Sequence, residues 1–62
     1  MKVYVFGAET YKSFGGKLIE IKIIAEDKKT AVEMMRDICK NSKCINEDEG
    51  FFLNDEWDYE TK

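Results

Sequence analysis

Two segments in the first half of the chain have the two-residue alternation that is typical of β-strands. Residues 2–8 are rich in β-branched and aromatic side chains, and residues 17–25 alternate isoleucine with other residue types. Gly15 and Gly16 lie between the two segments and supply the positive φ angles of a chain reversal at little cost. The pattern therefore predicts an antiparallel hairpin with a long loop.

The alternation also sorts the hairpin side chains into two sets, because successive residues of a strand point to opposite faces. We expect the face that packs against a helix to carry Val3, Val5, Ile19, Ile21 and Ile23. The apolar residues on the other face are Tyr4, Phe6, Leu18 and Ile24. An apolar patch of this kind is typical of a binding surface, unless the C-terminal segment or a second copy of the chain covers it.

Residues 27–40 change to the period of an amphipathic helix. Asp27 is placed to accept an orphan backbone N–H as the N-cap, and Asn41 is placed to end the helix in the left-handed conformation. The apolar stripe that we expect to face the sheet consists of Ala31, Met34, Met35, Ile38 and Cys39. The sequence thus predicts one helix packed on one face of the hairpin.

After the helix the pattern weakens. Residues 51–53 have the composition of a short strand, and residues 56–60 alternate two aromatic residues with three acids, as a half-buried strand does. Asn54 and Asp55 would form a turn between these strands, or begin a single helical turn. The whole chain, 1–62, is predicted to form one α+β domain in ββαββ or ββαβ order.

The net charge of −3 is unevenly distributed. Residues 1–46 hold nine lysines and arginines against six acids, for a charge of +3, whereas residues 47–62 hold one lysine against seven acids, for −6. The acidic segment 47–62 also carries large apolar side chains, namely Phe51, Phe52, Leu53, Trp57 and Tyr59. Because a disordered tail is poor in such residues, the segment is predicted to fold onto the domain or to dock on a partner.

The composition excludes several functions. The chain has no histidine and two cysteines, Cys39 and Cys44, so neither a four-ligand zinc site nor a Ser–His or Cys–His catalytic pair is expected. We predict no enzymatic activity, no cofactor and no metal, and reduced thiols in a cytoplasmic protein. The chain lacks a run of 18 apolar residues and a signal-peptide core, which supports that location.

Nucleic-acid binding is an alternative prediction. Tyr4 and Phe6 on an open sheet face resemble the aromatic platforms on which single-stranded bases stack. Such sites also need a cationic groove, and the basic residues of this chain are dispersed among acids. A homodimer of structural role that buries the same face, with Leu18 and Ile24, is a further alternative.

The charge distribution favours an acidic surface that binds a protein. Alternate residues of a strand stand about 6.6 Å apart, so Glu56, Asp58 and Glu60 would form a row of negative charge. Aromatic residues often dominate the energetics of interfaces. The predicted partner-binding residues are Glu47, Asp48, Glu49, Asp55, Glu56, Trp57, Asp58, Tyr59 and Glu60.

The opening Met-Lys-Val-Tyr-Val-Phe, the hairpin, the short amphipathic helix and the acidic, aromatic ending together resemble small proteins encoded by phages and mobile elements. Some of those proteins inhibit host nucleases, and anti-CRISPR proteins are among them. The resemblance implies a non-enzymatic inhibitor whose acidic surface occupies the basic groove of a nucleic-acid-handling enzyme. It covers architecture and composition and not a motif, so no functional residue is carried over from it.

Overall fold

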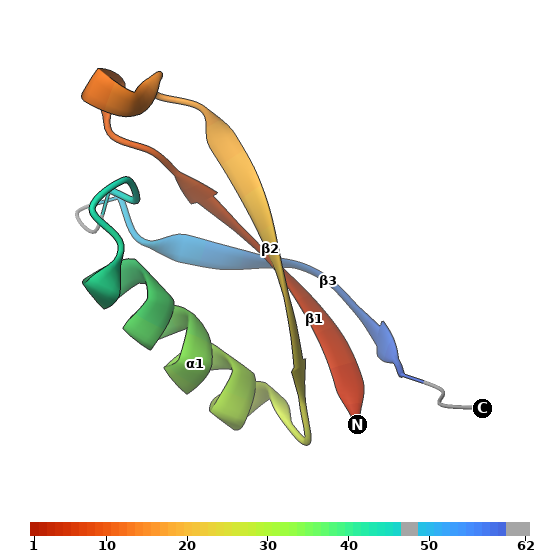
Figure 1. Cartoon of the computed structure of the whole chain (residues 1–62). Coiled ribbons are helices and arrows are strands. Elements are labelled where there is room, and N and C mark those ends of the chain that lie inside the picture. Colours follow the sequence, from red (N-terminus) through yellow and green to blue (C-terminus); the bar gives the residue numbers. More distant parts are fainter. Residues whose placement is uncertain (47–48, 60–62) are drawn as a thin grey trace.

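The first two strands pair as the alternation predicts. In the computed structural model, which describes residues 1–46 and 49–59, β1 (Lys2–Glu9) and β2 (Leu18–Ala25) form an antiparallel hairpin (Figure 1). A short 3-10 helix, η1 (Lys12–Phe14), lies in the hairpin loop and was not predicted. The α-helix α1 (Lys28–Asn41) and the strand β3 (Phe51–Asp58) follow. The predicted α+β class is therefore confirmed.

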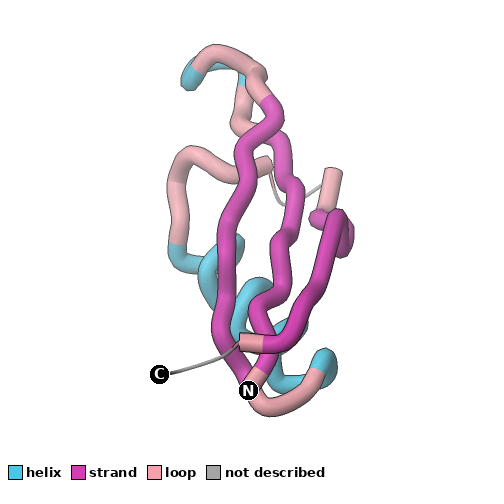
Figure 2. Tube along the Cα trace, turned by 90° about the vertical axis from the view of Figure 1, so that its right-hand side faces the viewer, coloured by secondary structure: helices cyan, strands magenta, loops and turns pink. Residues whose placement is uncertain are grey.

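The sheet has the strand order β2-β1-β3, with β1 in the centre (Figure 2). β3 lies antiparallel to β1 along nearly its whole length, from Ala8 opposite Phe51 to Lys2 opposite Asp58. Of the two predicted orders, the structure has ββαβ: the strands expected at 51–53 and 56–60 are joined in the single strand β3, and neither a turn nor a helical turn forms at Asn54 and Asp55. The register shifts between Val5 and Phe6, so a β-bulge accommodates an extra residue and one strand continues where a turn was expected.

The helix packs on the face of β1 opposite to the predicted one. In the register of the hairpin, Tyr4 stands opposite Ile23 and Phe6 stands opposite Ile21, so the aromatic residues share the isoleucine face. Tyr4 and Phe6 are 2% and 1% exposed, and the prediction that they lie on the face away from the helix is wrong. Alternation shows which residues of one strand share a face, but the register decides which faces of two strands combine.

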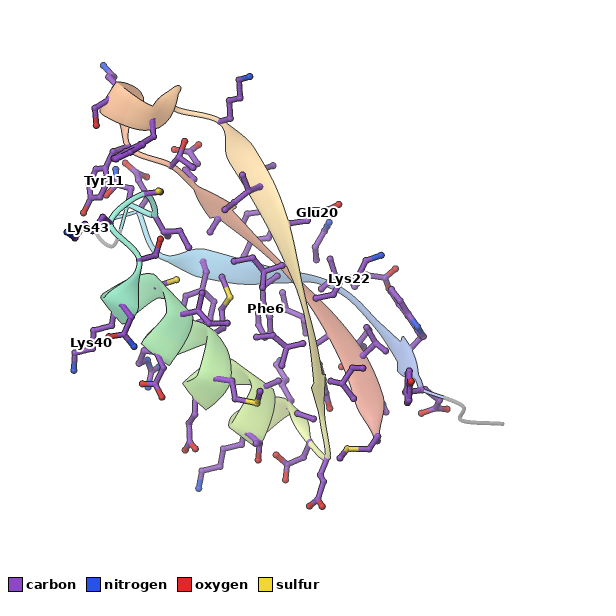
Figure 3. The ribbon with its side chains drawn as sticks, viewed as in Figure 1. Phe6, Tyr11, Glu20, Lys22, Lys40 and Lys43 are labelled. Carbon is purple, nitrogen blue, oxygen red and sulfur yellow. The ribbon has the colours of Figure 1, made fainter. Side chains whose placement is uncertain are left out.

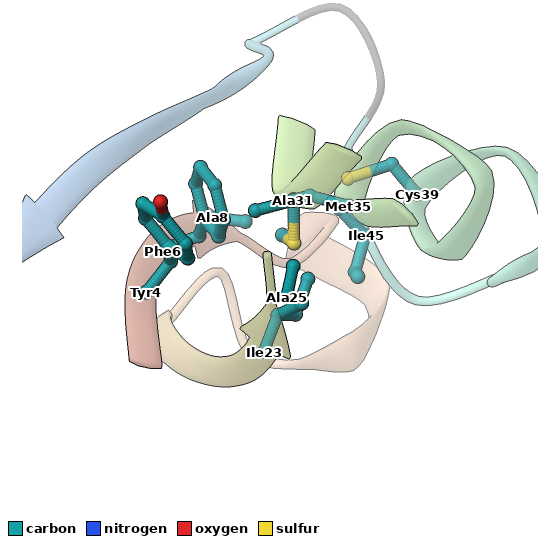
Figure 4. Close-up of a cluster of buried hydrophobic side chains, with 9 residues drawn as sticks. All are labelled: Tyr4, Phe6, Ala8, Ile23, Ala25, Ala31, Met35, Cys39 and Ile45. Carbon is teal, nitrogen blue, oxygen red and sulfur yellow. The ribbon is translucent and has the colours of Figure 1, made fainter. Parts of the chain in front are cut away.

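The core lies between α1 and this face of the sheet. Phe6 and Phe51 meet edge to face with their ring centroids 5.5 Å apart, which joins β3 to the core. The buried side chains that form the cluster are Tyr4, Phe6, Ala8, Ile23, Ala25, Ala31, Met35, Cys39 and Ile45 (Figure 4). Burying a large apolar side chain contributes about 1.5–3 kcal/mol, so Tyr4, Phe6 and Met35 are major sources of stability.

The two ends of α1 differ in how well the sequence predicts them. The carboxylate of Asp27 accepts a hydrogen bond of 2.8 Å from the backbone N–H of Thr30, which confirms the predicted N-cap. Asn41 is the last helical residue and not a left-handed cap, because Ser42 ends the helix in an extended conformation. The N–H of Ser42 donates to the carbonyl of Ile38 and satisfies one carbonyl at this end of the helix.

The chain reversal predicted at the two glycines is confirmed, and two further features of the chain can be stated. Gly15 and Gly16 have φ values of 104° and 58°, as the predicted reversal requires. No disulfide joins Cys39, which is buried, to Cys44, which is exposed. Within the described residues, no helix is long and apolar enough to cross a membrane.

Candidate protein interface

Three carboxylates gather at the C-terminal half of β3. Asp55, Glu56 and Asp58 are all exposed, and we call this group the acidic edge. Within the described residues, the backbone of α1 lies close to β2 and β1 but not to β3, and the three carboxylates are open to solvent. The first half of β3 packs on the core through Phe51 and Leu53, and the second half carries the charge.

Side chains of the acidic edge point to both sides of the sheet. Glu56 and Asp58 stand opposite Tyr4 and Lys2, on the helix side. Asp55, opposite Val5, lies on the open face together with Trp57. The alternation of the tryptophan with its acidic neighbours was predicted and is confirmed. A partner can therefore meet negative charge and a large aromatic surface on one strand.

The two exposed aromatic residues at this end are held in place. Trp57 and Tyr59 are 43% and 42% exposed. The backbone N–H of Tyr59 donates to the carbonyl of Met1 at 3.1 Å, which ties the end of β3 to the start of β1. Residues whose backbone is already ordered lose less conformational entropy on binding, which suits Trp57 on β3, and Tyr59 directly after it, to anchor an interface.

β3 is also an edge strand, because β1 is the only strand that pairs with it in the described part of the chain. Such a strand presents unpaired N–H and C=O groups along its outer side, and charged side chains restrict which chains can pair there. Strand addition is one way in which proteins bind extended segments. An acidic edge strand favours a segment that carries lysine or arginine.

The open face of the sheet, on the side away from α1, is bridged by side chains from the two outer strands. Figure 3 shows Glu20 and Lys22 on this face and Phe6 on the opposite one. The Glu20 carboxylate accepts a hydrogen bond of 2.7 Å from the Nδ2 of Asn54, and the Nζ of Lys22 lies 6.0 Å from the centre of the Trp57 ring. These contacts pass over β1 and help to bury its valines.

Phe52 completes this arrangement at the other end of the open face. Its ring lies over Gly7, and a Cβ at that position would overlap the ring. Lys22 and Phe52 were not among the predicted site residues. The sequence does contain one indication of the position of Phe52. A glycine inside a strand pattern often marks a close approach by another group, and Gly7 is such a glycine.

The predicted acidic surface is brought together only in part. Asp55, Glu56, Trp57, Asp58 and Tyr59 share one end of β3, whereas the exposed Glu49 precedes the other end. The remaining predicted acids, Glu47, Asp48 and Glu60, lie outside the described residues.

The alternative sheet-face site is not formed as predicted. Tyr4 and Phe6 are buried under the helix and present no ring to a base, while Leu18 and Ile24 are 60% and 45% exposed on the open face. The opposite placements follow from the register, which pairs Val3 with Ile24. The open face is therefore apolar at its β2 side, but its large aromatics come from β3.

A hollow of about 350 Å³ lies between the C-terminal part of α1 and the start of β3. Its lining residues are Arg36, Asp37, Cys39, Lys40, Gly50 and Phe51. Within residues 1–46 and 49–59, no group of three or more metal-binding side chains occurs. The lining combines two cations with a carboxylate, a thiol and an aromatic ring.

Comparison of the chain with protein-family models, with curated proteins and with solved structures finds no match. Functional inference therefore depends on the geometry of the described residues.

Proposed function

We propose that this protein is a binding module whose acidic edge, with Trp57 and Tyr59, docks on a basic surface of another protein. The observation that carries the proposal is the position of Asp55, Glu56 and Asp58 on an edge strand that the helix leaves uncovered. The carboxylates select a cationic partner and speed its association, and the aromatic rings supply the buried contact area.

Support comes from the way the fold treats this end of β3. A strand that served only to complete the core would bury its apolar side chains and would have no need of charged side chains on its outer face. Here the core contacts of β3 end at Leu53, and the strand continues to Asp58 with exposed side chains. The same stretch keeps its backbone paired to β1, so the charges are held at fixed spacing.

The class of partner follows from the charge. A surface with several carboxylates and an exposed tryptophan fits a groove lined by lysine and arginine, such as one that holds nucleic-acid phosphates. Occupying that groove would exclude the nucleic acid. Inhibition of a nucleic-acid-handling protein is thus the specific role that we propose, and it requires no catalytic group in this chain.

The experiment that tests this function is a comparative capture from a lysate of the native host. The protein is immobilised through a biotin–maleimide at Cys44, because this thiol is exposed and lies at the opposite end of the sheet from Asp58. A tag directly at Met1 or Tyr59 is unsuitable, because the backbone N–H of Tyr59 donates to the carbonyl of Met1 beside the acidic edge. A nuclease-treated lysate removes proteins that are bridged by nucleic acid.

The test variant combines Asp55→Asn, Glu56→Gln and Asp58→Asn, and the matched control combines Glu26→Gln, Glu33→Gln and Asp37→Asn. Both triple variants change the net charge by the same amount, and all six positions are exposed. The proposal predicts a protein that the wild type and the control retain and the test variant loses. Equal retention by all three would show that the acidic edge is not the binding surface.

Inhibition is tested separately on the captured protein. A labelled oligonucleotide bound to it should be displaced by the wild type, and the displacement should weaken as salt is raised. If the partner binds the oligonucleotide and this protein at the same time, this protein does not bind in the nucleic-acid groove, and the proposed inhibition is contradicted.

A further inference from the structure

The opposite edge of the sheet carries a different signal. β2 is an edge strand, and its exposed side chains on the open face are Leu18, Glu20, Lys22 and Ile24, which combine two large apolar residues with one acid and one base. An exposed and largely apolar edge strand invites pairing with another chain. The acidic edge, on which the proposed function depends, lies on the other side of β1 and is separate from this strand.

Helix α1 adds apolar surface beside β2. Met34 and Ile38 are 42% and 36% exposed, although they were predicted to face the sheet. Arg36 and Lys40 line the hollow beside Phe51, so their flank of the helix faces β3. Residues two apart on a helix are about 200° apart, which places Met34 and Ile38 on the flank toward the free edge of β2.

We propose that a second copy of this chain pairs with β2, strand to strand and antiparallel, about a two-fold axis at Ile21. Residues opposite each other in such a pair have numbers that add to the same value. With the axis at Ile21, Glu20 meets Lys22 of the second copy, and Lys22 meets its Glu20. Leu18 likewise meets Ile24, so charges and apolar side chains both match.

The charge pattern selects this axis over its neighbours. Moving the axis to Glu20 would place two glutamates opposite each other, and moving it to Lys22 would place two lysines opposite each other, which is unfavourable for directly opposed residues. An axis between two residues would pair the open face of one copy with the helix face of the other. The Ile21 axis alone keeps both helices on one side and neutralises both charged pairs.

The contacts that Glu20 and Lys22 make within one chain are compatible with the pairing. Asn54 donates to one oxygen of the Glu20 carboxylate, Oε2, and a carboxylate has a second oxygen that can accept from a lysine. On the helix side, Ile21 would meet its own copy, and the exposed Met34 and Ile38 of the two helices would approach each other. The result is a six-stranded sheet with an acidic edge at each end, which would bind a repeated partner surface with higher avidity.

Sedimentation equilibrium across a range of protein concentrations tests the proposal with three variants. Lys22→Glu places like charges opposite each other twice per dimer and should raise the dimer Kd by about tenfold or more. Adding Glu20→Lys to it exchanges the two charges and should restore the Kd to within about threefold of the wild type. Lys12→Glu makes the same change of charge on exposed η1 and should leave the Kd unaltered.

Three outcomes would overturn the proposal. A wild-type protein that stays monomeric into the millimolar range excludes the second copy and leaves this edge for a different partner. A Lys22→Glu variant that dimerises as well as Lys12→Glu places the contact elsewhere, and a charge exchange that fails to restore the Kd contradicts the Ile21 axis. Circular dichroism checks that each variant is folded. If Lys22→Glu does not fold, it is replaced by Leu18→Ser, at a position that is 60% exposed.

Discussion

β2 and β3 pair with the same central strand, yet their free edges have opposite chemistry. The β3 edge carries Asp55, Glu56 and Asp58 at its exposed end, and two such strands from separate copies would repel each other. The β2 edge carries one acid and one base between apolar residues, so it matches a second copy of itself. The difference teaches how one small sheet can keep self-association and partner binding apart.

The burial of the residues explains why the two edges can differ so much. The helix covers the β2 side of the sheet, and the core needs from β3 only its first three residues, through Phe51 and Leu53. The side chains in the last part of β3 are exposed, so this part of the strand can carry charge. β2 keeps apolar residues along its whole length, because its helix-facing side chains join the core.

The largest effect is predicted for a substitution in the core of β1, the strand with which both β2 and β3 pair. Phe6→Ala deletes a ring that is 1% exposed and contacts Phe51, so it should lower the free energy of unfolding by about 3–5 kcal/mol. Phe52→Ala, at a 49% exposed ring, is the control and should cost clearly less. Urea unfolding followed by circular dichroism measures both. Similar losses for the two variants would contradict the assignment of Phe6 to the helix side.

That assignment also shows how far the sequence determines the fold. Periodicity was sufficient for the hairpin, the helix and the Asp27 cap, because each depends on neighbours in the chain. Periodicity could not decide whether Tyr4 and Phe6 or Val3 and Val5 face the helix, because both faces of β1 are apolar. That choice depends on the pairing register with β2, which the loop fixes.

The candidate site was predictable to a similar extent. The alternation around Trp57 gave the arrangement of the acidic edge, since it is a local property of one strand. The bulge between Val5 and Phe6 decides between the predicted ββαββ and ββαβ orders, because it lets one strand continue through Asn54 and Asp55. It depends on pairing with β1, which is distant in the sequence. The contact of Lys22 with Trp57 joins residues on two strands and has no signal in either segment alone.

The second prediction tests whether charge keeps the β3 edge unpaired. Neutralising Asp55, Glu56 and Asp58 removes like-charge opposition worth roughly 0.2–1 kcal/mol per pair, so self-association should begin at about tenfold lower concentration. Light scattering compares this variant with the control of equal net charge, Glu26→Gln/Glu33→Gln/Asp37→Asn. The comparison separates the local effect at β3 from the effect of net charge. Identical scattering of the two would mean that net charge alone sets solubility.

The third prediction concerns the link between the edges across the open face. Lys22→Ala removes the cation over Trp57 and should lower the free energy of unfolding by about 0.5–1 kcal/mol. Because Trp57 is the single tryptophan, its fluorescence reports on this contact, and acrylamide should quench it more strongly in the variant. Unchanged quenching would show that the lysine does not shield the ring.

The smallest predicted effect lies at the helix start and depends on pH. The backbone N–H of Thr30 donates to the Asp27 carboxylate and lowers the pKa of that group below its ordinary value of 3.8, with Lys29 adding to the shift. The folded state therefore holds the carboxylate ionised, and its contribution is present above pH 3.8 and is lost as pH falls through the lowered pKa.

Thermal unfolding at several pH values checks this sign. Asp27→Ala should have a lower Tm than the wild type at pH 7, and the difference should shrink toward about pH 2. Asp27→Asn keeps an acceptor oxygen but does not titrate, so its Tm should lack this part of the pH dependence. A difference between wild type and Asp27→Ala that persists unchanged at low pH would contradict the proposed role of the ionised cap.

Amide hydrogen exchange resolved by residue can establish whether the two edges serve different partners. We expect that raising the protein concentration protects amides of β2, between Leu18 and Ile24, and that adding the captured basic partner protects amides of β3, between Asp55 and Asp58. Protection of β3 on concentration, or no protection of β3 by the partner, would contradict this division between the edges.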